Sequence, residues 1–388
     1  MWRHVAANGI TFLIVALFLL AGVIVWGTQS YQAQGPLAQG ICLQVQPGSN
    51  MRRVSQQLEE QGAISSGAIF RMGADYSEKS GDLKAGSFLV PEQASMKQIV
   101  DLVTSSGQST CGTEVVYRVG VRRNLVQVRE LDPSTSAYAE VAEFDPAEDE
   151  APAEYEAVKQ QDDTRYRIAV AEGVTSWQVA TALGEIDILE GTIAETPPEG
   201  MLAPDSYEFA PGDSRAAIIA RMEAAQTQIL ADAWAARADG LPVTTPEEAL
   251  ILASLVEKET GVPTERRQVA SVFVNRLERG MRLQTDPAVI YGVTKGEGIL
   301  GRGLRRSELD APTPWNTYVI PGLPPTPIAN PGRASIEAAL NPDTTDFVFF
   351  VADGSGGHAF ATNLDDHNRN VAAWRAIEAQ QAAGGTDN

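Results

Sequence analysis

The chain has 388 residues, enough for two or three domains, and its hydrophobic content of 44% is ordinary for a globular protein. Its formal charge of −20 argues against a nucleic-acid partner, because phosphate binding requires clustered Lys and Arg. The chain has three histidines and two cysteines and lacks HExxH and CxxC motifs, so we expect no metal site and no cofactor.

The first expected element is a transmembrane helix at residues 9–27, an uncharged apolar run about long enough to cross a bilayer. Arg3 precedes the run and the next basic residue is Arg52, so the positive-inside rule puts the N-terminus in the cytoplasm and the rest outside the plasma membrane. A cleaved signal peptide is the alternative. A signal-peptidase site requires small residues at positions −3 and −1, and cleavage after Ala33 would put Tyr31 at position −3.

A small domain is expected at residues 41–112, after a cytoplasmic tail at 1–8, the span and a spacer at 28–40. The patterns predict strands at 41–45 and 84–90 and helices at 50–62, 66–74 and 95–104. Both cysteines bracket this segment. An oxidising exterior permits a Cys42–Cys111 disulfide, and two free thiols are equally open.

A linker with an acidic insertion is expected at residues 113–165, with one strand near its start. Its part 140–163 is acidic, punctuated by Ala and Pro, and has no apolar period. A larger α+β domain with helices packed on small sheets follows at 166–380, and a disordered tail at 381–388. Its expected elements are strands at 166–170, 346–351 and 358–361, helices at 175–183, 214–238, 245–260, 264–277 and 363–383, and irregular chain at 280–332.

The helix that ends near Glu259 carries the strongest catalytic signal. Thr245 as N-cap and Gly261 beyond the last turn mark its ends. At about 100° per residue, Glu259 falls on the apolar stripe, whereas Glu257 points away from it. A carboxyl on an apolar face is costly unless it is paired or protonated, and a protonated carboxyl suits a general acid near neutral pH. A solvated helix end is the plain alternative.

Polar and aromatic side chains gather in the chain after this helix. Amide, hydroxyl and ring groups together supply the contacts that sugars need, although each residue alone has an ordinary role in a turn or core. No GxSxG motif occurs and neither cysteine is near a histidine, which leaves acyl transfer without a nucleophile. The candidate contacts are Gln284, Asp286, Tyr291, Asn316 and Tyr318.

Several motifs together resemble the bacterial endolytic murein transglycosylase family, also called MltG or YceG-like. They occupy residues 253–260, 273–277, 281–287, 315–318 and 322–325, and 350–354 with His358. The similarity covers about 164–373, the apolar span, and residues 41–109, which are similar to the family's LysM-like module. The chain departs from the family at Trp315, where Tyr is usual, and in its longer acidic segment.

The resemblance implies a membrane-anchored enzyme, outside the inner membrane of a bacterium, that cuts the MurNAc–GlcNAc β-1,4 bond of nascent peptidoglycan. The product would carry a 1,6-anhydro-MurNAc end and cleavage would end strand elongation, with cell-wall synthases as partners. Glu259 matches the family's essential glutamate, and Asn275 joins the five contacts above as a matching position. The rival functions are a hydrolytic muramidase and an inactive wall-binding scaffold.

Overall fold

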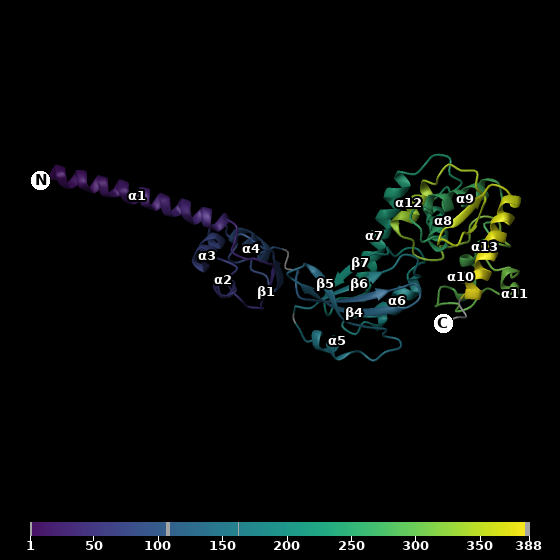
Figure 1. Ribbon diagram of the computed structural model, residues 1–388, viewed down its shortest axis with the longest axis horizontal. Coiled ribbons are helices and arrows are strands. Elements are labelled where there is room, and N and C mark those ends of the chain that lie inside the picture. The colour runs from purple at the N-terminus through teal and green to yellow at the C-terminus, as the bar shows by residue number, and fades with distance from the viewer. Residues whose placement is uncertain (1, 106–108, 162, 385–388) are drawn as a thin grey trace. The chain divides into compact units, whose positions relative to one another are not determined.

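The computed structural model describes residues 2–105, 109–161 and 163–384, and Figure 1 shows its helices and strands. The structure is mixed α+β, begins with an apolar helix and contains small sheets, as the sequence predicts. The chain divides into two compact units. The first holds the chain up to residue 116 with 126–144 and 148–166, and the second holds 117–125, 145–147 and the chain from 167 onward.

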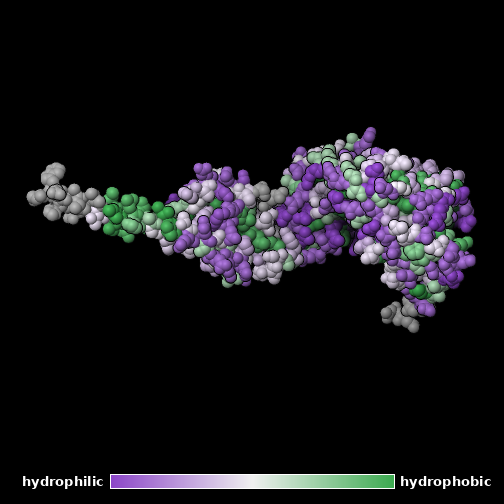
Figure 2. All heavy atoms as spheres, turned by 90° about the horizontal axis from the view of Figure 1, so that it is seen from above, coloured by the Kyte–Doolittle hydropathy of each residue, from purple (hydrophilic) through white to green (hydrophobic). Residues whose placement is uncertain are grey.

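Helix α1 (Trp2–Gln32) carries the predicted membrane span. Its segment Thr11–Gln32 contains a window with a mean hydropathy of 2.4, and none of that window is buried in the protein. Figure 2 shows its side chains as a hydrophobic surface. By length and composition, α1 is able to cross a bilayer.

The first unit contains three capped helices that share a core with a two-stranded sheet. The side chains of Asn50, Ser66 and Ser95 accept backbone N–H groups at the helix starts. The largest core side chains belong to Leu43, Leu58, Phe70, Phe88 and Ile99, each at most 1% exposed. The elements are β1 (Ile41–Val45) antiparallel to β2 (Gly86–Val90), with α2 (Met51–Glu60), α3 (Gly67–Tyr76) and α4 (Met96–Val103).

A disulfide joins the two cysteines of this unit. Cys42 lies in β1 and Cys111 is fully buried, with their Cα atoms 5.7 Å apart and a separation of 69 positions in sequence. A cross-link that closes a loop of this length restricts the unfolded chain, which typically stabilises a fold by about 2–4 kcal/mol. The two free thiols that the sequence left open do not occur in the structure.

The segment predicted as an acidic linker forms strands and a helix instead. A five-stranded sheet has the strand order β5-β4-β3-β6-β7, so β5 is an edge strand. On its solvent side, Gln127 donates hydrogen bonds to Glu140 and Glu143, whereas the buried rings of Phe144 and Tyr155 lie 5.2 Å apart. The charged residues lie on the exposed face of this edge strand, so the composition of the segment is that of a linker although it forms a strand. The elements are β3 (Thr113–Val119), β4 (Asn124–Asp132), β5 (Ala137–Phe144), α5 (Ala153–Val158), β6 (Arg165–Val170) and β7 (Ser206–Phe209).

Helix α8 (Pro246–Glu259) lies at the centre of the second unit. Residues 249–256 are all buried, so the helix is enclosed on every face and not along a single stripe. Figure 1 shows α8 beside α9 and α12, and four helices of the described chain are in contact with it. These neighbours are α7 (Arg215–Ala235), α9 (Arg266–Glu278), α10 (Asp286–Thr294) and α12 (Arg333–Leu340).

The remaining elements follow the prediction except between residues 280 and 332, at β7 and α12, which were not predicted, and at 381–384, which are helical and not a disordered tail. Residues 280–332 were expected to be irregular, but they contain α10 and α11, and Pro287 in the first turn of α10 is a helix-start signal. Residues 385–388 of the predicted tail lie outside the described residues. The other elements are α6 (Ser176–Glu185), α11 (Arg306–Leu309), the hairpin of β8 (Phe349–Ala352) and β9 (His358–Ala361), and α13 (Leu364–Gly384).

Candidate active site

The position of Glu259 is set by the ends of α8. At the start of the helix, Thr245 Oγ1 accepts the backbone N–H of Glu248 at 3.2 Å and Pro246 takes the first helical position. The helix ends at Glu259 because Thr260 has extended backbone. A helix fixed at both ends and enclosed by its neighbours holds its last side chain in one place.

The carboxyl of Glu259 is partly buried, and burial raises its pKa to about 7. Contact with the Thr285 hydroxyl opposes this rise, the negative charge of Asp286 adds to it, and the charges of His358 and Arg276 reduce it. A carboxyl with this pKa holds a proton below neutral pH and releases it readily above. It can therefore serve both as acid and as base within one reaction.

The neighbouring glutamate has a structural role. Glu257 Oε2 accepts the backbone N–H of Gly332 at 3.0 Å, at the N-cap of α12. Lys258 Nζ donates to the Gly173 carbonyl at 3.0 Å. Glu257 is thus engaged in holding another helix, which leaves Glu259 as the candidate acid.

The loop before α10 brings Thr285 and Asp286 toward Glu259. Gln284 has a φ of 50°, in the left-handed region, where a residue other than glycine carries a cost of about 1–3 kcal/mol. The Gln284 N–H donates to the Thr317 carbonyl at 3.1 Å, and the Thr285 N–H donates to Thr317 Oγ1 at 2.9 Å. These bonds hold the strained loop in place and leave the Gln284 side chain exposed.

Asp286 and Tyr318 form a pair close to Glu259. The Tyr318 hydroxyl donates to Asp286 Oδ1 at 2.7 Å. Burial raises the pKa of Tyr318, as do this bond to Asp286 and the charge of Glu259, so the hydroxyl stays protonated as a donor. Of the predicted contacts, the structure therefore brings Asp286 and Tyr318 to the candidate acid, with Gln284 in the adjoining loop.

The two predicted asparagine contacts hold the protein's own main chain instead. Asn316 is fully buried, and its amide donates to three carbonyls at 2.7–3.2 Å around the end of α11 while its oxygen accepts the Tyr318 N–H. Asn275 donates to the carbonyls of Thr345 and Phe347 at 2.8 and 2.9 Å. A buried amide must find such partners, so its presence in a motif does not indicate a substrate contact.

Tyr291 faces a pocket of about 500 Å³ and not the group around Glu259. Its ring packs on Trp315 with centroids 5.7 Å apart, and its hydroxyl contacts Glu199. Trp315 Nε1 donates to Thr326 Oγ1 at 3.0 Å. Tryptophan at position 315, where the family usually has Tyr, therefore leaves no unpaired donor, because its indole N–H is hydrogen-bonded within the protein.

His358 and Arg276 act on Glu259 through their charges but were not predicted as site residues, nor was Glu265, which holds His358. Glu265 accepts the backbone N–H of His358 at 2.9 Å, and a second bond of 2.8 Å joins Glu265 to His358 Nδ1. Arg276 donates to two main-chain carbonyls at 2.6 and 2.7 Å. These bonds fix a histidine and a guanidinium whose charges act on Glu259.

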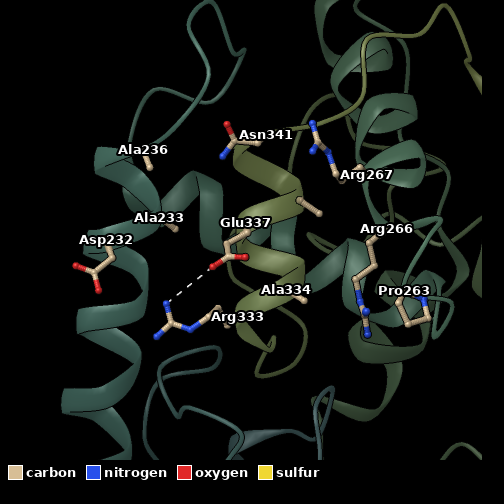
Figure 3. Close-up of a pocket in the computed structure, with 11 residues that line it drawn as sticks. Asp232, Ala233, Ala236, Pro263, Arg266, Arg267, Arg333, Ala334, Glu337 and Asn341 are labelled. Carbon is tan, nitrogen blue, oxygen red and sulfur yellow. Dashed lines mark ion pairs between the residues drawn. The ribbon is translucent and has the colours of Figure 1, made fainter.

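Another pocket, of about 490 Å³, lies between α7, α9 and α12 (Figure 3). It contains Arg266, Arg267 and Arg333, each of which pairs with a carboxylate at 3.1–3.9 Å. Figure 3 shows Arg333 and Glu337 pointing toward each other. The charges of the three arginines in this pocket are therefore neutralised by carboxylates of the protein itself. Across the described ranges, no group of three or more His, Cys, Asp or Glu side chains is placed to hold a metal ion.

Comparison with known proteins gives one family. The model of the YceG-like family matches residues 43–373. An endolytic murein transglycosylase of Bacillus subtilis is 38% identical over 173 residues, which are 45% of this chain and 47% of that protein. An endolytic murein transglycosylase of Streptococcus pneumoniae D39 is 28% identical over 385 residues, covering 95% of this chain and 65% of that protein.

A solved structure is also similar to the chain. The crystal structure of a YceG-like protein from Listeria monocytogenes is 25% identical, with a TM-score of 0.45, and the match covers 85% of this chain and 99% of that one. The chain spans about half the length of the Bacillus relative and 65% of the length of the streptococcal one.

Proposed function

The chain belongs to the YceG-like family, and on that premise we propose that it is a lytic transglycosylase of peptidoglycan with Glu259 as its acid and base. The observation that carries the proposal is the Glu259 carboxyl, whose burial raises its pKa to about 7 at the end of an enclosed helix. The two relatives are endolytic murein transglycosylases, which supports peptidoglycan as the substrate.

The proposed reaction needs a single carboxyl. Glu259 gives its proton to the oxygen of the MurNAc–GlcNAc β-1,4 bond as the bond from C1 to that oxygen breaks. The carboxylate then takes the proton of the C6 hydroxyl on the same MurNAc, and O6 bonds to C1 to close the 1,6-anhydro ring. The nucleophile is tethered, so no water is consumed, and the N-acetyl group stabilises the oxocarbenium-like state.

The neighbours of Glu259 assist both halves of this cycle. The negative charge of Asp286 favours the protonated carboxyl before cleavage, whereas Arg276 and His358 stabilise the carboxylate that follows. Tyr318 keeps Asp286 in place through its 2.7 Å hydrogen bond. Gln284, Asp286 and Tyr318 are the proposed sugar contacts that remain after the two asparagines are set aside.

The proposal extends to where the enzyme works. Helix α1 anchors it in the inner membrane of a bacterium with the N-terminus in the cytoplasm, so cleavage takes place outside that membrane and ends nascent strands beside the synthases. Residues 41–112 form a LysM-like domain between the anchor and a catalytic domain that starts near residue 166. The disulfide of Cys42 and Cys111 supports an oxidising location.

Digestion of purified sacculi by the full chain in detergent separates the three candidate functions. We expect soluble muropeptides with 1,6-anhydro ends, each lighter by one water per cleavage than the product of a muramidase. Hydrated reducing ends would indicate the muramidase. Binding to sacculi without any soluble product would indicate the scaffold, and either result would contradict the proposed function.

A further inference from the structure

We propose that the pocket beside α8 and α10, defined by Arg122, Lys258, Ile290, Tyr291, Ile299 and Arg302, binds the carboxylate-bearing peptide stem of the glycan substrate. The pocket has a volume of about 500 Å³, which is within the usual range for sites that enclose a small ligand. The inference rests on the proposed function, because it names the part of the substrate that this neighbouring site takes.

The pocket borders the candidate active site at two points. Lys258 is next to Glu259 on α8, and Pro287, which also lines the pocket, is next to Asp286 on α10. Adjacent residues of a helix point about 100° apart, so the pocket lies on the side of α8 next to the side that carries Glu259. Helices α8 and α10 are in contact. A group that leaves the sugar near Glu259 therefore reaches the pocket within a few bonds.

The chemistry of the substrate requires a receptor at this place. In peptidoglycan the peptide is attached through a lactyl ether to C3 of MurNAc, the same ring whose C1 is attacked. When C1 of this ring lies against Glu259, the peptide attached at C3 must also lie close to Glu259. It carries small apolar side chains and free carboxylates, so a matching site combines apolar walls with cations.

The cations of the pocket match such a ligand. Its described lining contains three basic side chains, Arg122, Lys258 and Arg302, and no Asp or Glu, in a chain whose formal charge is −20. Lys258 Nζ donates to the Gly173 carbonyl, and the negative charges of Glu257 and Glu199 also act on this ammonium group. Glu308 compensates Arg302 through a hydrogen bond of 2.9 Å. Arg122 is exposed and forms no ion pair with any described residue, so it is the cation best able to pair with a ligand carboxylate.

The apolar wall and the entrance fit a small peptide. Ile290 and Ile299 line the pocket, and Ile299 is 58% exposed, so a ligand that covered it would remove apolar surface from water. The wall at Gly296, Gly298 and Gly301 has φ values of 76°, 98° and 67°, which glycine adopts without strain. A side chain at Gly296 would meet the Tyr291 ring at 3.0 Å, so the glycine keeps this wall thin.

The test is equilibrium binding to the full chain in detergent of a MurNAc-peptide and of MurNAc alone, its lactyl carboxyl capped as an amide as it is in the MurNAc-peptide. Neither probe contains a glycosidic bond to cleave, so the result stands whether or not the chain cleaves glycan. We expect Arg122→Glu to weaken binding of the MurNAc-peptide about tenfold, as for the loss of one charge-assisted contact. The matched control Arg123→Glu changes the adjacent exposed arginine, which does not line the pocket, and should bind as the wild type does.

A second variant tests the apolar wall. Ile299→Glu adds a negative charge at an exposed position, so it should also weaken binding of the MurNAc-peptide without affecting the fold. Binding of MurNAc alone should be the same for all of these proteins. The proposal is overturned if the peptide adds no affinity to MurNAc, or if Arg122→Glu and Arg123→Glu bind the MurNAc-peptide equally well.

Discussion

Glu259→Gln is expected to lower the rate of glycan cleavage by about 10²- to 10⁴-fold, the usual contribution of a general acid. Glutamine keeps the size of the side chain and its place at the end of α8 but has no proton to give to the leaving oxygen. The rate is measured as anhydro ends formed per minute from purified strands, with circular dichroism to check that the fold is intact.

The matched control is Glu257→Gln, two residues earlier on the same helix. Glu257 accepts the N–H of Gly332 at 3.0 Å, and the glutamine oxygen can still accept it, so the replacement should keep α12 in place and leave cleavage within a few-fold of wild type. Wild-type rates in Glu259→Gln, or equal losses in both variants, would remove Glu259 from the mechanism.

The second large effect is on the dependence of the rate on pH. Burial raises the pKa of Glu259 to about 7, so the carboxyl is protonated below that pH and charged above it. The reaction begins with the protonated form. We therefore expect kcat to fall about tenfold for each pH unit above 7. The measurement is kcat on purified strands between pH 5 and pH 9.

Asp286→Asn provides the control for this profile. The charge of Asp286 raises the pKa of Glu259, so its removal should move the alkaline limb to lower pH. The asparagine oxygen can still accept the Tyr318 hydroxyl, so the loop keeps its hydrogen bond. A kcat that stays flat up to pH 9 in the wild type would contradict the assigned role of Glu259.

Glu259 could be proposed as the acid from the sequence because the signals that favour it are local. The caps of α8, the apolar run and the contrast between Glu257 and Glu259 all lie within about 16 consecutive residues, where helix geometry applies directly. His358 and Glu265 could not be found in this way, since they are 93 residues apart in sequence and meet only in the folded chain. The same holds for the bond between Arg276 and the carbonyl of Val348, which are 72 residues apart in sequence.

Other predictions differed from the structure where the same type of residue is compatible with two roles. Asn316 was predicted to bind a sugar because amides do so, but the same amide satisfies the carbonyls at the end of α11. The acidic stretch around Glu140 and Glu143 was predicted to be a linker, although its charges lie on one face of an edge strand. Burial decides between such alternatives, and composition does not report burial.

The most direct measurement of whether Glu259 holds its proton near neutral pH compares the unfolding free energies of the wild type and Glu259→Gln between pH 4.5 and pH 8. A carboxyl pKa raised by folding, here from 4.5 to about 7, stabilises the fold only while it is protonated, so the wild type should lose stability as the pH rises through this window. Glutamine does not titrate. At about 1.4 kcal/mol per pKa unit, the variant should gain up to about 3 kcal/mol on the wild type by pH 8. A difference that stays constant across this range would show that Glu259 is an ordinary ionised carboxylate and would contradict the account.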